Sequence, residues 1–138
     1  MEQRLTIIGL GVSDLQGATD FYEHKFGWKK MDSSNESISF FHLNGILLSL
    51  YPREKLAEDA TVDPIGSGFK GFSLAYNTRT KEEVDDLVSD LEAKGVVIVK
   101  KPEDVFWGGY SGYVADLDGN LWEIAYNPFL PIHADGNV

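Results

Sequence analysis

Hydrophobic and polar residues alternate with a period of two in the stretch YVADLDGNLWEIAYNP near the C-terminus. Trp122 and Ile124 fall on one face of the strand that this period predicts, whereas Glu123 and Ala125 fall on the other. A carboxylate in such a strand either points to water or points into a cavity that uses its charge. The function that the sequence supports depends on which of these two environments surrounds Glu123.

Two other stretches alternate with the period of an α-helix. Their apolar stripes are, in chain order, Leu15, Ala18, Tyr22 and Phe26, then Val84, Leu87, Val88 and Leu91. Asp14 and Thr80 precede these stripes and are good helix N-caps. Thr80 also forms a capping-box pattern with Glu83. Gly27 and Gly95 follow the stripes, as expected where a helix ends.

The two helices belong to an internal repeat. Residues 5–30 and 71–101 both predict strand, helix, strand, and hairpins follow at 37–52 and 112–128. The hairpin turns contain NG and DGN, which are strong turn signals. Each half of the chain therefore predicts a βαβββ unit.

Alignment of Ile7 with Ser73 gives each unit one apolar face and one face of small residues, because Gly9 falls on Ala75. A unit of this size is too small to be comfortable alone. We therefore predict an α+β fold in which two βαβββ modules pair into a curved mixed sheet. That sheet would enclose a cup lined by the small-residue faces, with the helices on the outside.

The expected organisation is a single domain across residues 1–138. Module 1 would occupy 5–52 and module 2 would occupy 71–128. The linker at 53–70 would contain a short helical turn and then a segment rich in Pro, Gly and Ser. Residues 129–138 would form a tail.

Composition and charge narrow the classes of partner. The chain has 138 residues, with 12 basic against 22 acidic residues, a net charge of −10 and no cysteine. No basic surface for nucleic acid is visible, and neither disulfides nor thiolate metal sites can form. No signal peptide or membrane span is visible, so we expect a cytoplasmic protein without a membrane partner. The acidity is compatible with a cationic ligand.

Three stretches carry a resemblance to a known family: GVSDLQGATDFYEHKFGW, NGILLSLYPREKLAEDA and PEDVFWGGYSGYVADLDGNLWEI. Together they resemble the vicinal oxygen chelate superfamily, which includes glyoxalase I, extradiol dioxygenases and bleomycin- and fosfomycin-resistance proteins. The resemblance covers nearly the whole chain. It implies paired βαβββ modules with a cup between them, and a homodimer. In metal-dependent members, His, Gln or Glu at four strand positions facing the cup hold a divalent ion.

Carried onto this chain, those four positions fall on Ile7, Ser49, Ser73 and Glu123. A shift of one residue would exchange Ser49 for Leu48, but the flanking leucines favour Ser49. Only Glu123 is a good ligand for a metal ion. We therefore predict no cofactor, with Zn²⁺, Ni²⁺, Mn²⁺ or Fe²⁺ as the alternative.

The three histidines do not complete a metal site in this alignment. His24 is expected on a helix surface and His133 in the tail. His42 is expected at the end of a hairpin strand, either at the cup rim or in a supporting role beside the turn.

Aromatic residues in the segment VFWGGYSGY form a second group of interest. Trp107, Tyr110 and Tyr113 stand among glycines, and they either wall a pocket for a flat or cationic ligand or cover the core. Glu123 likewise remains open between three roles: residual metal ligand, acidic group for an organic ligand, and solvated or hydrogen-bonded structural residue.

The favoured function is small-molecule binding of the glyoxalase/bleomycin-resistance type. The expected cup residues are Ile7, Ser49, Ser73, Glu123, Trp107, Tyr110 and Tyr113. One alternative is a metal-dependent enzyme of the same superfamily, resembling a lactoylglutathione lyase, an isomerase or a dioxygenase. The other is a metal-free enzyme with Glu123 as general acid or base.

Overall fold

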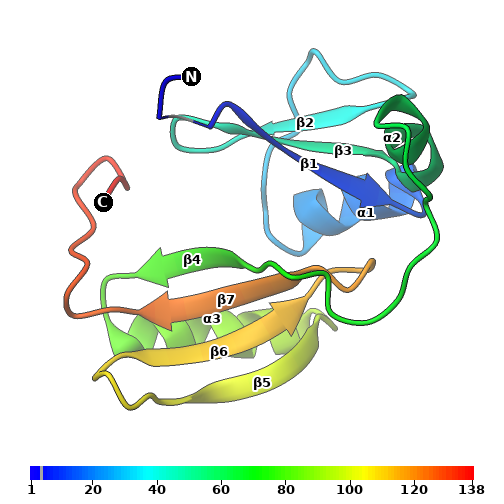
Figure 1. Cartoon of the computed structure of the whole chain (residues 1–138). Coiled ribbons are helices and arrows are strands. Elements are labelled where there is room, and N and C mark those ends of the chain that lie inside the picture. The colour runs from blue at the N-terminus through cyan, green and yellow to red at the C-terminus, as the bar shows by residue number, and fades with distance from the viewer. Residues whose placement is uncertain (4) are drawn as a thin grey trace. The chain divides into compact units, whose positions relative to one another are not determined.

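A computed structural model describes residues 1–3 and 5–138, and it divides the chain into two units, Met1–Gly68 and Phe69–Val138. The described residues form seven strands and three helices, with the strands arranged in two mixed sheets (Figure 1). The α+β class predicted from the sequence is therefore confirmed. Each unit holds one of the two sheets and is described separately.

The first unit, unit 1, contains three strands and two helices. They are β1 (Ile7–Val12), α1 (Leu15–His24), β2 (Ser39–His42), β3 (Leu47–Pro52) and α2 (Arg53–Asp59). The strand order is β1-β3-β2, with β1 parallel and β2 antiparallel to β3. Helix α1 begins after Asp14, whose carboxylate accepts a hydrogen bond from the Gly17 backbone N–H at 3.1 Å, as the N-cap prediction required.

The core of unit 1 combines alternate strand positions with a cluster of aromatic rings. The buried strand residues include Leu10, Val12, Phe41, Leu48 and Leu50. Tyr22 on α1 is fully buried and stacks on Trp28, with the ring centroids 5.5 Å apart. The buried hydroxyls of Thr19 and Ser39 hydrogen-bond at 2.8 Å and join α1 to β2. The Thr19 hydroxyl also donates to the Leu15 carbonyl at 2.6 Å, so it links the α1 backbone to Ser39.

The expected second strand of module 1, WKKMD, is largely absent. Lys30 and Phe41 form an isolated antiparallel bridge, and the Met31 N–H donates to the Phe40 carbonyl at 2.8 Å. The chain then turns, because the Ser34 N–H donates to the Met31 carbonyl at 3.0 Å. The prediction of a strand here was wrong because the polar turn residues that follow Met31 end the pairing after one bridge.

The second unit, unit 2, contains four strands and one helix. They are β4 (Leu74–Thr78), α3 (Lys81–Ala93), β5 (Val97–Asp104), β6 (Tyr110–Ala115) and β7 (Leu121–Tyr126). The strand order is β4-β7-β6-β5, with β4 parallel to β7 and the other pairs antiparallel. The order matches β1-β3-β2 with one added edge strand, which confirms the internal repeat.

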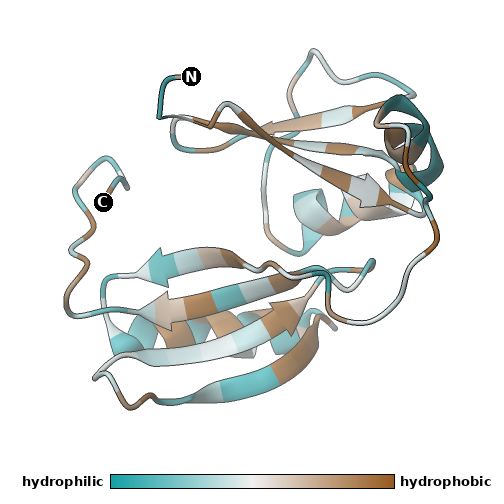
Figure 2. Cartoon of the chain, viewed as in Figure 1, coloured by the Kyte–Doolittle hydropathy of each residue, from teal (hydrophilic) through white to brown (hydrophobic). Residues whose placement is uncertain are grey.

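Helix α3 covers one face of the unit 2 sheet and contacts β5, β6 and β7 (Figure 1). Hydrophobic and hydrophilic positions alternate along it (Figure 2), and its residues Val84, Val88 and Leu91 are buried. The Thr80 hydroxyl accepts from the Glu83 N–H at 3.2 Å. The Glu83 carboxylate accepts from the Arg79 N–H at 2.7 Å, so the reciprocal half of the expected capping box lies one residue earlier than predicted.

Gly112 on β6 lies where β5 is irregular. The pairing of β5 with β6 shifts register on both sides of Lys100, which brings the β5 backbone close to Gly112. A Cβ atom on Gly112 would lie 2.8 Å from the Lys100 carbonyl oxygen and 2.9 Å from the Pro102 nitrogen. Only glycine fits there without a shift of the backbone.

We expect Gly112→Ala to lower the free energy of unfolding by about 1 to 3 kcal/mol, because the added methyl group overlaps backbone atoms of β5. Urea denaturation followed by circular dichroism measures this change. Gly9→Ala on β1 is the matched control, since its Cβ would meet only the Ser49 hydroxyl at an ordinary 3.5 Å. Equal stability of Gly112→Ala and the unsubstituted protein would contradict the close approach of β5 and β6.

Candidate functional site

A row of four side chains crosses the unit 2 sheet on the face opposite α3. Glu123 on β7 pairs with Ala75 on β4 and with Tyr113 on β6, and Tyr113 pairs with Lys100 on β5. Their chain neighbours Trp122 and Val114 are buried on the α3 side. Because successive side chains of a strand point to opposite faces, the row points away from the helix.

Glu123 has a specific partner in this row. The Tyr113 phenol lies directly opposite Glu123 in the pairing of β6 with β7. Burial raises the pKa of the Tyr113 phenol above its ordinary value, and the charge of Glu123 and hydrogen bonding to it raise that pKa further, against a smaller opposing effect of Lys100. Glu123 itself is half-buried. A neutral phenol is thus the cross-strand neighbour of its carboxylate on this face of the sheet.

Lys100 completes the row as its basic member. Its ammonium lies 2.7 Å from a carboxylate oxygen of Glu103. That hydrogen bond is the main reason why the pKa of Lys100 is raised, and the charges of Tyr113 and Glu123 add to it. Sequence reasoning missed Lys100, because the irregular register of β5 hides it from a simple period of two.

Ser49 occupies the position in unit 1 that Glu123 occupies in unit 2. On β3 it pairs with Gly9 of β1 and Phe40 of β2, just as Glu123 pairs with Ala75 and Tyr113. Leu48, the alternative that a one-residue shift would select, is fully buried in the unit 1 core. The register therefore supports the alignment of Ser49 with Glu123.

The other two aligned positions lie at strand starts. Ile7 is the first residue of β1, pairs with Leu47 and is 43% exposed. Ser73 immediately precedes β4 and is exposed. Ile7 and Ser49 thus belong to unit 1, whereas Ser73 and Glu123 belong to unit 2.

These four positions do not fit a resident metal ion. Ile7 has no donor atom, two positions are serines, and Glu123 alone carries a carboxylate. Among residues 1–3 and 5–138, no group of three or more His, Asp or Glu is placed to hold a metal. The three histidines lie elsewhere: His24 pairs with the Asp20 carbonyl on α1, His42 ends β2, and His133 lies in the tail.

The aromatic residues of the segment 105–113 divide between the two faces of the sheet. Tyr110 donates a hydrogen bond from its hydroxyl to Asp85 on α3 at 2.8 Å, and the Lys81 ammonium lies 5.5 Å from its ring centre. It therefore lies on the helix side, away from Tyr113. The sequence grouped these two tyrosines in one cup. They are three residues apart on β6, and side chains an odd number of residues apart on a strand point to opposite faces of the sheet.

Trp107 belongs to the turn between β5 and β6. The Val105 N–H donates to the Gly109 carbonyl at 3.0 Å, and the Trp107 ring lies directly over Gly109. A Cβ atom on Gly109 would lie 2.0 Å from that ring. The indole thus covers the turn backbone, while the neighbouring Phe106 is fully exposed.

The motif DLDGN forms the turn that leads into β7. The Asp116 carboxylate accepts from the Asp118 and Asn120 N–H groups at 3.0 and 2.8 Å and from the Asn120 side-chain amide at 2.7 Å. Lys70 donates to the Asp118 carbonyl and to the Asn120 side-chain oxygen, both at 2.9 Å. This network shapes the turn whose register sets Glu123 opposite Tyr113.

The chain is thus an α+β protein in which a mixed sheet is repeated, and the sheet of unit 2 carries a polar row on one face. The sequence matches the family described as "Glyoxalase/Bleomycin resistance protein/Dioxygenase superfamily" over residues 4–124. The chain therefore belongs to the glyoxalase/bleomycin resistance protein/dioxygenase superfamily, which confirms the resemblance seen in the sequence. No helix among the described residues is long and apolar enough to cross a membrane.

Several solved structures resemble the chain. A glyoxalase-related enzyme from Fulvimarina pelagi is 39% identical, with a TM-score of 0.89 over 99% of this chain and 97% of that chain. A lactoylglutathione lyase from Agrobacterium tumefaciens is 23% identical, with a TM-score of 0.71 over 92% of this chain and 96% of that chain. The fosfomycin resistance protein FosX from Listeria monocytogenes is 24% identical, with a TM-score of 0.71 over 94% and 97%. The last two show likeness of fold alone, and comparison with curated proteins gives no match.

We expect Glu123→Gln to lower the pKa of Tyr113 while leaving it above its ordinary value, because burial, the largest cause of the shift, remains. NMR titration of ring-labelled tyrosine measures this change. Tyr110, whose pKa is raised mainly by its hydrogen bond to Asp85, should not respond and serves as the internal control.

The same shift predicts a pH dependence of stability. A raised pKa in the folded state means that the contribution of Tyr113 is fully present below pH about 10 and is lost as the pH rises through the folded-state pKa. The unfolding free energy of Tyr113→Phe should therefore fall less steeply above pH about 10 than that of the unsubstituted protein. Parallel curves for the two proteins would contradict this assignment.

Proposed function

We propose that this chain binds a small organic molecule that carries a basic or cationic group, with Glu123 as its recognition residue. The observation that carries the proposal is the Tyr113–Glu123 pair, in which a half-buried carboxylate lies opposite a neutral phenol whose pKa it raises. The Glu123 carboxylate accepts through more than one lone pair, so it can bind an ammonium or amidinium.

The neighbours of Glu123 support a ligand in this row. Ala75 pairs with Glu123 on one side and is exposed, so the carboxylate is not covered by a bulky side chain of β4. On the other side, the face of the Tyr113 ring is suited to a cation. The net charge of −10 favours the approach of a cationic molecule.

A second candidate function is proton transfer by the same pair. The pair sets a carboxylate opposite a phenol, which are side chains of the types that act as general base and general acid. Similarity to a glyoxalase-related enzyme at 39% identity also favours an enzyme. In this candidate, Glu123→Gln would abolish turnover while a neutral ligand still bound.

Binding is tested with benzamidine as a cationic probe and benzamide as its neutral counterpart. Benzamidine should raise the melting temperature of the chain, with an added stability of about 2.7 kcal/mol at a hundredfold excess over its Kd. Benzamide should give a smaller shift, because it cannot pair with a carboxylate. Glu123→Gln should lose the benzamidine shift.

The matched control for this experiment is Asp86→Asn, which removes one exposed carboxylate from α3. It should keep the full benzamidine shift. If Asp86→Asn loses as much of the shift as Glu123→Gln, general charge explains the binding and the proposal fails. The proposal fails equally if benzamide binds as well as benzamidine.

Metal independence is the second prediction of this proposal. Zn²⁺, Ni²⁺, Mn²⁺ and Fe²⁺ should give no thermal stabilisation that depends on Glu123, because Glu123 is the only good metal ligand among the four aligned positions. Metal analysis of protein purified without chelator, followed by thermal titration, measures this. A near-stoichiometric metal that is lost in Glu123→Ala would overturn the proposal in favour of a metal-dependent lyase, isomerase or dioxygenase.

The homodimer implied by the family resemblance is also part of the proposal. A hydrodynamic mass of about twice the 15.4 kDa of one chain would support it.

A further inference from the structure

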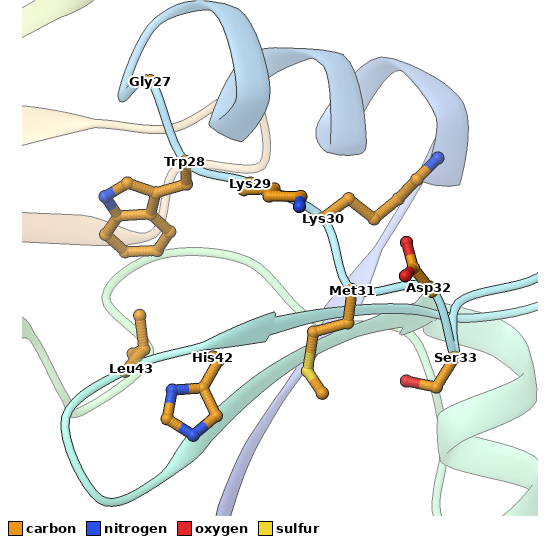
Figure 3. A pocket seen from close by; sticks show the side chains of 9 residues that line it. All are labelled: Gly27, Trp28, Lys29, Lys30, Met31, Asp32, Ser33, His42 and Leu43. Atoms are coloured by element: carbon orange, nitrogen blue, oxygen red, sulfur yellow. The ribbon is translucent and has the colours of Figure 1, made fainter.

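Unit 1 contains a cavity that the Glu123 row does not involve. It lies beside β2, between the segment 27–33 and the end of β2 at His42 and Leu43 (Figure 3). Its volume is about 690 Å³, which is within the range of cavities that hold small molecules. All of its lining residues belong to unit 1.

The cavity exists because the chain pairs with β2 only briefly. The bridge between Lys30 and Phe41 is the one pairing of this segment with β2 among the described residues, and the turn at Met31 then leads the chain away. Gly27, with φ of +70°, turns the chain sharply before it reaches Trp28. The edge of β2 that a full strand would cover is thus left beside an open space.

Trp28 forms a fixed wall of the cavity. Its indole stacks on Tyr22 with the ring planes 25° apart, and it also contacts Phe26 and Phe41 at centroid distances of 5.4 and 6.1 Å. Three buried or half-buried rings therefore hold its orientation. A wall that is already ordered binds a flat ligand without the entropy loss of fixing a free side chain.

Apolar and basic groups share the rest of the lining. Figure 3 shows Met31, His42 and Leu43 around one opening with Trp28, whereas the Lys30 side chain runs away from them toward α1. Lys30 and Asp32 carry opposite charges, so Lys29 supplies the net positive charge of the lining when His42 is neutral. Lys29 and His42 are both exposed.

We propose that this cavity is a second ligand site, which binds a small aromatic carboxylate. The ring of the ligand lies against Trp28, Met31 and Leu43, and its carboxylate pairs with Lys29. Aromatic stacking and contact with the methionine sulfur supply the apolar part of the binding. The charge preference is opposite to that of the Glu123 row, so the two sites take different molecules.

The test uses 2-naphthoate and its neutral counterpart 2-naphthamide with the full chain. Calorimetry should show that the acid binds more tightly than the amide. NMR should locate the binding by shifts of the Trp28 indole N–H and the Leu43 amide. Lys29→Glu should weaken 2-naphthoate about tenfold at low ionic strength, and Lys29→Gln should give an intermediate loss.

Two control variants separate this site from general charge and from the Glu123 row. Lys101→Glu reverses an exposed charge on β5 of unit 2 and should leave 2-naphthoate binding unchanged. Glu123→Gln should also leave it unchanged. The proposal is overturned if 2-naphthoate does not bind, or if it binds no more tightly than 2-naphthamide. It is also overturned if the NMR shifts are confined to unit 2, or if Lys29→Glu leaves the affinity for 2-naphthoate unchanged.

Discussion

The hydrogen-bonded turn between β6 and β7 is the constraint on which the polar row of unit 2 depends. Asp116 accepts three hydrogen bonds across this turn, and the Lys70 ammonium donates a further hydrogen bond to the Asp118 carbonyl. A strand that slips by one residue turns every side chain to the opposite face. With one residue of slip, Glu123 would enter the core beneath α3 and Trp122 would take its place on the open face. The turn therefore decides the chemistry of the sheet.

The Tyr113–Glu123 pair bears directly on the question that the sequence raises about Glu123. A carboxylate in a half-buried strand is costly unless a donor pairs with it. Tyr113 faces Glu123 as a neutral phenol, because a phenol is protonated at neutral pH. Lys100 pairs with the Glu103 carboxylate at 2.7 Å and acts on Glu123 through its charge. This arrangement is the basis of the proposal that Glu123 recognises a cationic ligand.

Much of the fold can be predicted from the sequence, because its strongest signals are local. Helix starts at Asp14 and Thr80, turns at NG and DGN, and the repeat all follow from residue type and spacing. The missing strand after Trp28 could not be predicted, because its end depends on hydrogen bonds of a polar turn rather than on hydrophobicity. Lys100 and the opposite faces of Tyr110 and Tyr113 depend on register, which the irregular β5 obscures. The contribution of each aligned site position to binding remains a prediction.

The same repeat gives the two units opposite chemistry for a structural reason. In unit 2 the edge strand β5 is complete, so it covers the edge of β6 and contributes Lys100 to the row across the sheet. In the part of unit 1 that the structure describes, the equivalent segment pairs only at Lys30, and Ser49 stands where unit 2 has the carboxylate. Register makes Lys30 the counterpart of Ile98, since their partners Phe41 and Val114 occupy matching core positions beside Leu48 and Trp122. The short pairing at Lys30 leaves the space beside Trp28 open. The difference between the rows has a separate cause, because Ser49 and Phe40 stand where unit 2 has Glu123 and Tyr113.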